Sequence, residues 1–265
     1  MQKPNGGEIR VLAGITILNT RPKADQGSDC PLSLLLREQG ASVIHIPLVT
    51  TQPTLSAWPG YPAPPPDRLF FTSPRAVTAF MAQHPPGQPL PPAGAVGPET
   101  ARTLSAHGVE PAWQSSVFDA ATAARMLAAD LPPESHVLWP CGNRSNPNFQ
   151  TILEESGHRV TPMIVYKTLD APDIHPAFWA RSVAKAGVIT FTSPSAVHAG
   201  NRLLQETRQA ITHARLACLG PSTAAACTEM FGRADIIADP HTLSDLVKAI
   251  GVHLTDDRPS LFNPR

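Results

Sequence analysis

The chain has 265 residues, enough for one large domain or two of ordinary size, and 42% of them are hydrophobic, as a packed core requires. Its 21 basic and 21 acidic residues give a formal net charge of zero without any basic run, which argues against nucleic-acid binding. The first apolar stretch, 11–18, is broken by Gly14 and Thr16, so we expect a core strand there rather than an export signal. No apolar run approaches the roughly 18 residues of a membrane span. We therefore expect a cytoplasmic protein that does not bind membranes.

Cysteine and histidine are distributed without a metal-binding pattern. The sequence contains neither C-x-x-C nor H-E-x-x-H, so we expect reduced cysteines and no metal site. It also lacks G-x-G-x-x-G, the P-loop sequence and G-x-S-x-G, which removes the main support for dinucleotide binding, phosphate binding by a P-loop and a nucleophile elbow. The four cysteines are Cys30, Cys141, Cys218 and Cys227.

In chain order, short apolar runs alternate with amphipathic stretches that begin at Pro or a capping residue. The runs predict strands at 15–20, 43–49, 69–71, 95–96, 109–113, 136–139, 159–169, 188–191 and 215–219. The amphipathic stretches predict helices at 32–38, from 74, at 98–107, at 120–130 with Asp119 as N-cap, at 149–155, from 194, at 221–231 and at 242–253. Pro47 favours an edge position for the second strand. Regular alternation with short connections predicts parallel sheets with helices on both faces.

An internal repeat divides this pattern into two similar halves. The sequence FTSPRAV at 71–77 returns as FTSPSAV at 191–197, an offset of 120. Residues 36–43 align with 153–160 at an offset of 117, and the Gly-Pro-x-Thr-Ala sequence at 97–101 returns at 220–224 at an offset of 123. The repeat therefore predicts two α/β domains of about 120 residues each, with a ligand cleft between two like domains at the carboxyl ends of the strands.

The repeated turns are suited to anionic groups. Each leads from a strand into a helix N-terminus, where backbone N–H groups lack intrahelical partners. Hydroxyl groups from Ser73, Thr100, Ser193 and Thr223 add donors, although each can instead cap its own helix. Arg75, just inside the first of these helices, is either a ligand-binding residue or a solvated surface arginine. Four similar turns favour a ligand with several negative groups.

Tyr166, one of two tyrosines, is the candidate for proton transfer. It lies in the predicted strand 159–169, where a tyrosine can equally serve packing. A phenol with a pKa near 10 can donate a proton or a hydrogen bond to a leaving hydroxyl group.

Several motifs in the same order resemble those of the uroporphyrinogen-III synthase family. They are Asn19-Thr20-Arg21-Pro22, the two FTSP turns, the two Gly-Pro-x-Thr-Ala turns, Pro140-Cys141-Gly142-Asn143 and Val165-Tyr166. The resemblance covers about 12–254. It implies two flavodoxin-like parallel-sheet domains joined by a two-strand connector. One domain would hold 1–43 with 170–265, the other 52–160, and the connector strands would be 43–52 and 160–169.

The resemblance also implies an activity, that of a cyclising hydro-lyase of haem biosynthesis that needs no cofactor. Hydroxymethylbilane, a linear tetrapyrrole with eight carboxylates, would close to uroporphyrinogen III with loss of water and inversion of ring D through a spiro intermediate. Tyr166 would be the catalytic proton donor. The implied substrate-binding residues are Thr223, Ser193, Ser73, Arg75, Arg21, Thr100, Ser222 and Arg215. A monomer in transient contact with hydroxymethylbilane synthase is expected.

A non-catalytic bilobal binding protein for a polycarboxylate or tetrapyrrole ligand is the alternative. It would share the cleft and the four turns, but it would have no use for Tyr166.

Overall fold

The computed structural model describes residues 10–23, 29–54, 58–115, 120–171 and 173–256. Contacts between residues divide the chain into two compact units. The first contains 1–50 and 169–265, and the second contains 51–168. The chain therefore passes between the units twice, once near residue 50 and once near residue 168.

The first unit is built on a five-stranded parallel sheet. Its strands are β1 (Thr16–Asn19), β2 (Ser42–His45), β9 (Val188–Phe191), β10 (Arg215–Cys218) and β11 (Ile236–Ile237). They lie in the order β11-β10-β9-β1-β2, and each neighbouring pair is parallel. This is the flavodoxin-like strand order, 2-1-3-4-5, read from the other edge.

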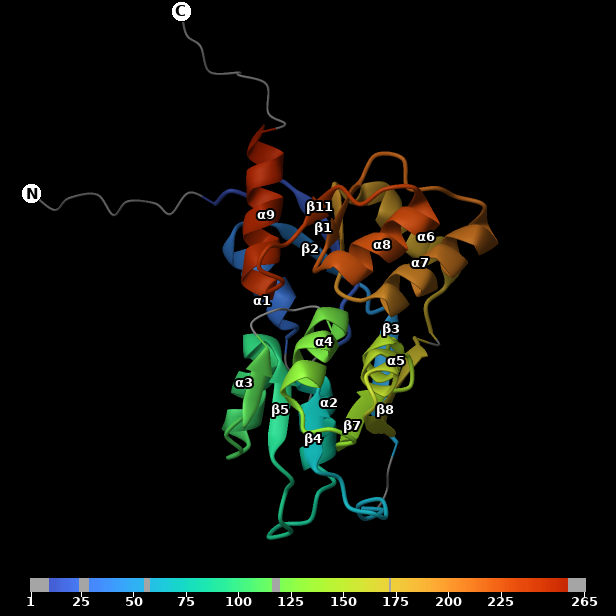
Figure 1. The fold of residues 1–265 in the computed structure, drawn as a ribbon. Helices are drawn as coiled ribbons and strands as arrows, with labels where there is room; N and C mark the ends of the chain where they lie inside the picture. Colours follow the sequence, from blue (N-terminus) through green and yellow to red (C-terminus); the bar gives the residue numbers. More distant parts are fainter. Residues whose placement is uncertain (1–9, 24–28, 55–57, 116–119, 172, 257–265) are drawn as a thin grey trace, which may run out of the picture. The chain divides into compact units, whose positions relative to one another are not determined.

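Helices cover both faces of this sheet (Figure 1). Adjacent strand residues point to opposite faces, so Ile17 packs in one core cluster and Leu18 in the other. The strands read as continuous apolar runs because both faces are covered. On one face lie α1 (Pro31–Glu38) and α9 (Leu243–Asp256), and on the other lie α6 (Pro176–Lys185), α7 (Pro194–Thr207) and α8 (Pro221–Phe231).

The second unit is built on a six-stranded sheet in the order β3-β8-β7-β4-β5-β6. Its strands are β3 (Val49–Pro53), β4 (Arg68–Phe71), β5 (Ala93–Val96), β6 (Trp113–Ser115), β7 (His136–Gly142) and β8 (Arg159–Asp170). From β8 to β6 every pair is parallel. β3 runs antiparallel to the end of β8, because Ala171 donates its N–H to the Leu48 carbonyl while Thr54 donates to the Val165 carbonyl.

Two helix pairs sandwich this sheet. Phe70 points into one core cluster, and its neighbours Leu69 and Phe71 point into the other. The first cluster is covered by α4 (Ala120–Asp130) and α5 (Asn148–Glu155), and the second by α2 (Pro74–Met81) and α3 (Gly97–Ala106).

The internal repeat corresponds to a common strand order. The strands β8, β7, β4, β5 and β6 occupy the places that β2, β1, β9, β10 and β11 occupy in the other sheet. Thus β4 and β9, the strands that enter the two Ser-Pro turns, are both third in the order 2-1-3-4-5. The second unit is a circular permutation of the first, since its chain begins at the third position.

Three sequence predictions differ from the structure, two elements were not predicted, and one prediction cannot be compared. The predicted strand 43–49 is two strands, because β2 ends at His45, before Pro47, and β3 starts at Val49. The strand predicted at 109–113 lies at Trp113–Ser115, and residues 11–14 form a turn before β1. Neither α6 nor β11 was predicted. Asp119, the predicted N-cap of α4, lies outside the described residues.

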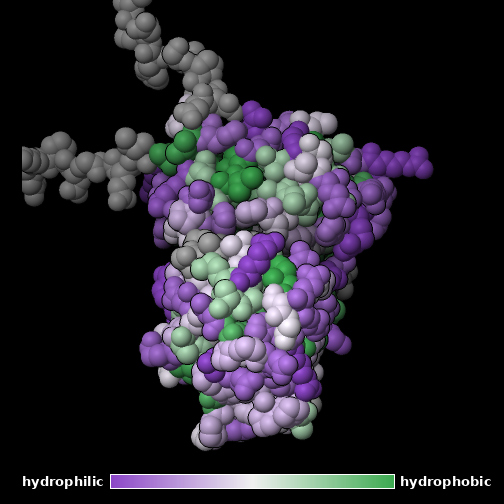
Figure 2. All heavy atoms as spheres, viewed as in Figure 1, coloured by the Kyte–Doolittle hydropathy of each residue, from purple (hydrophilic) through white to green (hydrophobic). Residues whose placement is uncertain are grey.

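Apolar residues are scattered over the surface. On the face that Figure 2 shows, green apolar residues are interspersed among purple polar ones. Large exposed apolar side chains come from separate elements, namely Leu34, Met126, Ile164, Phe178, Ile237 and Val252. In the described part of the chain, no helix combines the length and apolar character that crossing a membrane requires.

Candidate active site

In each sheet the parallel strands end at the same edge, and the strand order reverses beside the first strand of the order 2-1-3-4-5. This switch point lies between β7 and β4 in the second unit and between β1 and β9 in the first. Folds of this kind bind ligands outside the carboxyl ends of the strands at the switch point. We therefore describe the side chains at these two edges.

Tyr166 lies at the carboxyl end of β7, opposite Gly142. A register shift between Cys141 and Gly142 brings the pair together, and Asn143 donates its N–H to the Tyr166 carbonyl at 3.2 Å. A Cβ on Gly142 would lie only 2.6–2.8 Å from Cζ, Cε2 and Oη of Tyr166. The phenol ring therefore packs directly against the backbone of β7, in space that exists because residue 142 is glycine.

Ser73 and Arg75 at the start of α2 lie beside the Tyr166 phenol. The Ser73 hydroxyl caps α2 by accepting a hydrogen bond from the Ala76 N–H at 3.3 Å, and it also hydrogen-bonds with the Tyr166 hydroxyl. The guanidinium group of Arg75 donates to the hydroxyl of Thr51 in β3. The Tyr166 phenol of β8 is thus flanked by Gly142 of β7 and by Ser73 and Arg75 at the start of α2, and Thr51 of β3 binds Arg75.

Burial raises the pKa of Tyr166, although the Ser73 hydrogen bond and the positive charge of Arg75 act in the opposite direction. The phenol is therefore protonated at neutral pH, and a phenolate formed there would be stabilised by both neighbours. Burial also raises the pKa of the adjacent Cys141 thiol to about 12, so this cysteine is neutral.

The third predicted group of the second unit is Thr100, in α3. The helix begins at Gly97, which has φ +72°, and its N-cap Val96 provides no side-chain hydrogen bond. Thr100 itself is only 3% exposed. At this helix N-terminus the backbone N–H groups are therefore more available to a ligand than the buried Thr100 hydroxyl is.

The first unit carries the equivalent groups at its own switch point. Ser193 caps α7 by accepting from the Ala196 N–H at 3.4 Å, and Arg21 is the second residue after β1. In α8, Ser222 is exposed whereas Thr223 is 3% exposed, and the N-cap Gly220 provides no side-chain hydrogen bond. The two Ser-Pro turns have nearly identical cap geometry, since φ is −159° at both Ser73 and Ser193.

Arg215 lies apart from these groups. It is the first residue of β10 and pairs with Val188, the first residue of β9, so it lies at the amino edge of the sheet. A strand of four residues separates it from the carboxyl edge by roughly 10 Å. The expectation that Arg215 belongs with the turn groups fails in this respect, because the start and end of a parallel strand face opposite edges.

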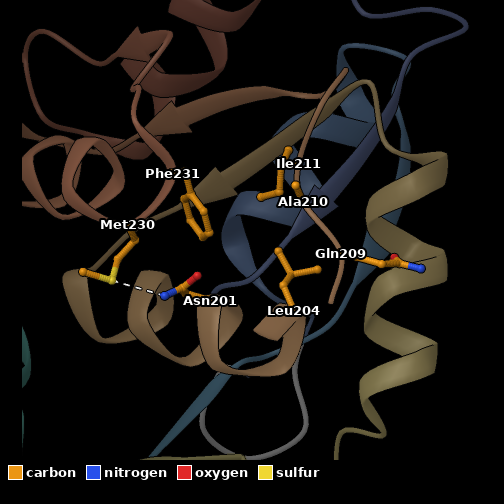
Figure 3. A pocket seen from close by; sticks show the side chains of 7 residues that line it. All are labelled: Asn201, Leu204, Gln209, Ala210, Ile211, Met230 and Phe231. Atoms are coloured by element: carbon orange, nitrogen blue, oxygen red, sulfur yellow. Dashed lines mark hydrogen bonds between the residues drawn. The ribbon is translucent and has the colours of Figure 1, made fainter. Parts of the chain in front are cut away.

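A cavity of about 250 Å³ in the first unit lies elsewhere as well (Figure 3). It is lined by side chains from the later turns of α7 and α8 and from the segment before β10, namely Asn201, Leu204, Gln209, Ala210, Ile211, Met230 and Phe231. The Asn201 amide points across it and donates to the Met230 sulfur at 3.3 Å. Most of the lining side chains are apolar and none is charged, and the cavity lies away from the turn groups.

A family model described as uroporphyrinogen-III synthase HemD matches residues 31–248, which is 218 of the 265 residues. The chain belongs to the uroporphyrinogen-III synthase family. A curated uroporphyrinogen-III synthase from Synechococcus elongatus is 29% identical over 257 residues, covering 90% of this chain and 95% of that protein.

Solved structures show the same fold. A mutant uroporphyrinogen III synthase from the extremely thermophilic bacterium Thermus thermophilus matches with a TM-score of 0.60 at 17% identity, covering 92% of this chain and 100% of that one. The enzyme from Helicobacter pylori also gives 0.60, at 18% identity, covering 91% and 99%. The predicted resemblance and the predicted pair of α/β parallel-sheet domains are thereby confirmed.

As a uroporphyrinogen-III synthase, the chain is a cyclising lyase of tetrapyrrole biosynthesis and acts on a tetrapyrrole substrate. Within the described residues, no three His, Cys, Asp or Glu side chains gather as a metal site would require.

Sequence reasoning did not assign roles to three residues of this synthase that the structure places around the predicted site. Thr51 binds Arg75, and Gly142 makes room for Tyr166. Asn143 fixes the strand end, because its side-chain oxygen accepts from the Thr168 N–H at 2.7 Å. The motif Pro140-Cys141-Gly142-Asn143 was the available signal for two of them, but nothing in the sequence singled out Thr51.

Proposed function

We propose that the substrate is hydroxymethylbilane and that the enzyme closes it to uroporphyrinogen III with loss of water. Ring D would invert through a spiro intermediate. The observation that carries the proposal is the protonated Tyr166 phenol at the carboxyl edge of the sheet, with Ser73 and Arg75 beside it. Family membership supplies the reaction, and this geometry supplies a group able to start it.

Tyr166 acts in this proposal as the proton donor to the departing hydroxyl of ring A. Loss of that hydroxyl leaves an azafulvenium cation, which ring D attacks through its substituted carbon. A buried phenol is a weak acid, so donation needs help at the moment of transfer. The Ser73 hydrogen bond and the Arg75 charge both favour the phenolate that results. Their contribution therefore falls on the transition state rather than on the bound substrate.

Carboxylate binding is proposed for the groups at both switch points. They are Ser73, Arg75 and Thr100 in the second unit and Arg21, Ser193, Ser222 and Thr223 in the first. Neutral hydroxyls and helix N-terminal N–H groups can hold carboxylates without a basic surface, which agrees with a net charge of zero. For the two buried threonines, the adjacent helix N–H groups are the proposed donors. The position of Arg215 at the amino edge speaks against including it.

No cofactor enters this reaction, because a proton and positioning suffice for loss of water and ring closure. We further propose that the enzyme works as a cytoplasmic monomer and receives its substrate by transient contact with hydroxymethylbilane synthase. The cysteines, all free, support a reducing compartment. Gel filtration with light scattering would detect a stable dimer, and chemical cross-linking with the synthase would detect transfer contact.

The test is an isomer assay with freshly made hydroxymethylbilane. Wild-type enzyme should give uroporphyrinogen III, whereas formation of the spontaneous isomer I alone would refute the proposed reaction. Tyr166→Phe should lower kcat while leaving the thermal midpoint close to that of the wild type, because only the hydroxyl is removed. Tyr61→Phe is the matched control, since it removes the hydroxyl of the other tyrosine and should retain full activity per folded molecule. Full activity of Tyr166→Phe would remove the phenol from the mechanism.

A further inference from the structure

A second group of reactive side chains lies at the carboxyl edge of the first unit. Cys30 is the N-cap residue of α1, and His45 is the last residue of β2. Asn19, the last residue of β1, pairs in register with His45. The side-chain amide of Asn19 donates to the Cys30 sulfur at 3.4 Å and to the Ser33 hydroxyl at 2.8 Å. The fold thus brings together a thiol, an imidazole and an amide that are distant in the sequence.

Hydrogen bonds fix the orientation of each member. The side-chain oxygen of Asn19 accepts from the Arg21 N–H at 3.0 Å and from the Thr190 hydroxyl at 3.4 Å, so the amide NH₂ must face Cys30. His45 Nε2 lies 2.8 Å from the Arg21 carbonyl oxygen. Because a carbonyl can only accept, Nε2 carries a hydrogen, and Nδ1 remains for the contact with Cys30.

The electrostatics of the pair favour a thiolate. Burial alone would raise the pKa of Cys30, but hydrogen bonds from His45, Asn19 and the backbone of Ser33 and Leu32 outweigh it and lower the pKa to about 6. The hydrogen bond with Cys30 in turn raises the pKa of His45, against the opposing effects of burial and of the Arg37 charge. The two shifts act in the same direction, because each favours the charged pair in which a thiolate stands beside an imidazolium.

The other cysteines have a different character. Burial raises the pKa of Cys141 to about 12. The thiol of Cys218 lies 3.4 Å from that of Cys227, and this hydrogen bond together with burial raises the pKa of Cys227. A reagent that requires a thiolate should therefore discriminate sharply in favour of Cys30.

We propose that Cys30 is a modification site that reacts with small peroxides to form a sulfenic acid. The thiolate attacks one peroxide oxygen, an S–O bond forms as the O–O bond breaks, and the sulfur is oxidised by two electrons while the peroxide is reduced. The imidazolium of His45 donates its proton to the departing oxygen, which leaves as water when the oxidant is hydrogen peroxide. The charges balance, because one anion and one cation become neutral.

The position of Cys30 is compatible with access by a molecule of this size. Cys30 itself is 2% exposed, but its neighbours Asp29 and Pro31 are both exposed and His45 is half-buried. The backbone on both sides of Cys30 is therefore at the surface, while its side chain packs in the core cluster with Leu32 and Leu36. Asp29 is engaged by Arg37 at 3.6 Å, so its negative charge is partly compensated.

The proposal is tested on the native, full-length wild-type protein. Brief treatment with iodoacetamide between pH 5 and 9, followed by peptide mass spectrometry, should alkylate Cys30 at least about tenfold faster than the other cysteines at pH 7. Its rate should be half-maximal near pH 6. Hydrogen peroxide with dimedone should place the sulfenic-acid adduct on the Cys30 peptide.

His45→Gln should move the half-maximal pH for Cys30 alkylation upward by about one unit or more, because the charged partner is lost. His84→Gln, at a histidine in the other unit, is the matched control and should leave it unchanged. A native protein in which Cys30 stays unmodified, reacts no faster than the other cysteines, or follows an ordinary thiol profile above pH 8 would overturn the proposal. The wild-type profile decides this even if His45→Gln does not fold.

Discussion

Gly142→Ala is the perturbation that tests the proposed site most directly. The added Cβ would lie 2.6 Å from Tyr166 Cζ, about 0.8 Å closer than the 3.4 Å at which ordinary contact begins. The phenol must therefore move by roughly this amount and lose its place beside Ser73. A misplacement of about 1 Å can cost about 100-fold in rate, so we expect kcat to fall by one to two orders of magnitude. Overpacking should also lower the free energy of unfolding by about 1–3 kcal/mol.

Gly94→Ala in β5 provides the matched control. A Cβ there would lie 2.5 Å from two ring atoms of Phe70, so the steric conflict is similar and lies in the same unit, but it is remote from Tyr166. Both variants should lower the denaturation midpoint, whereas only Gly142→Ala should lower the rate per folded molecule. Rates come from the isomer assay, and the folded fraction comes from circular dichroism.

A double-mutant cycle strengthens the comparison. If Gly142→Ala acts by displacing the phenol, then adding Tyr166→Phe should lower the rate by less than Tyr166→Phe does in the wild type. Additive effects, or full activity of Gly142→Ala, would refute the reasoning that the space above Gly142 positions Tyr166 for catalysis.

Three further predictions concern stability. Tyr61→Phe removes hydrogen bonds to His84 at 2.9 Å and to the Pro89 carbonyl at 3.2 Å, and should cost about 1–2 kcal/mol in denaturant unfolding. Burial lowers the pKa of His84 below 6.5, so the unfolded state binds a proton at a higher pH than the folded state does. As the pH falls below 6.5, the folded state therefore loses stability, and the thermal midpoint should drop more in the wild type than in His84→Gln. Thr242→Ala removes the cap that accepts from the Asp245 N–H at 3.2 Å, and should cost about 1 kcal/mol by the same unfolding measurement.

Much of the architecture could be predicted because both sheets are buried on two faces. Continuous apolar runs ended by Ser-Pro or Gly-Pro mark strands that lead into helices, and the prediction for β9 matches its observed bounds. The helix α6 was overlooked although His175-Pro176 is a good start signal, and the His175 side chain does accept from the Ala177 N–H at 3.2 Å. This helix lies between the predicted strands 159–169 and 188–191, where no element was predicted.

The site could be predicted only in part, for a physical reason. Motifs at strand ends fall at one edge of a parallel sheet, and on this ground the turns of Ser73 and Thr100 were grouped; they follow the parallel neighbours β4 and β5. The position of Tyr166 beside Ser73 was not predicted. The contacts that give these residues their chemistry depend on register between distant segments. The Arg75–Thr51 contact requires the return of β3 alongside β8, and the Cys30–His45 pair requires the N-terminus of α1 to lie above the end of β2. Sequence spacing carries no information on either.

The repeat explains why the two switch points differ in chemistry despite a shared scaffold. The offset of 117 that relates residue 43 to residue 160 relates Val49 to Tyr166. In the second unit β8 extends beyond β7, and Tyr166 lies opposite Gly142, the last residue of β7. In the first unit β2 ends at His45, and Val49 belongs to β3. The equivalent position in the first unit is therefore a valine in another strand, and β2 ends on the His45 imidazole. The longer β8 thus places a phenol beside the Ser-Pro turn of the second unit, whereas the shorter β2 ends on an imidazole at the edge of the first.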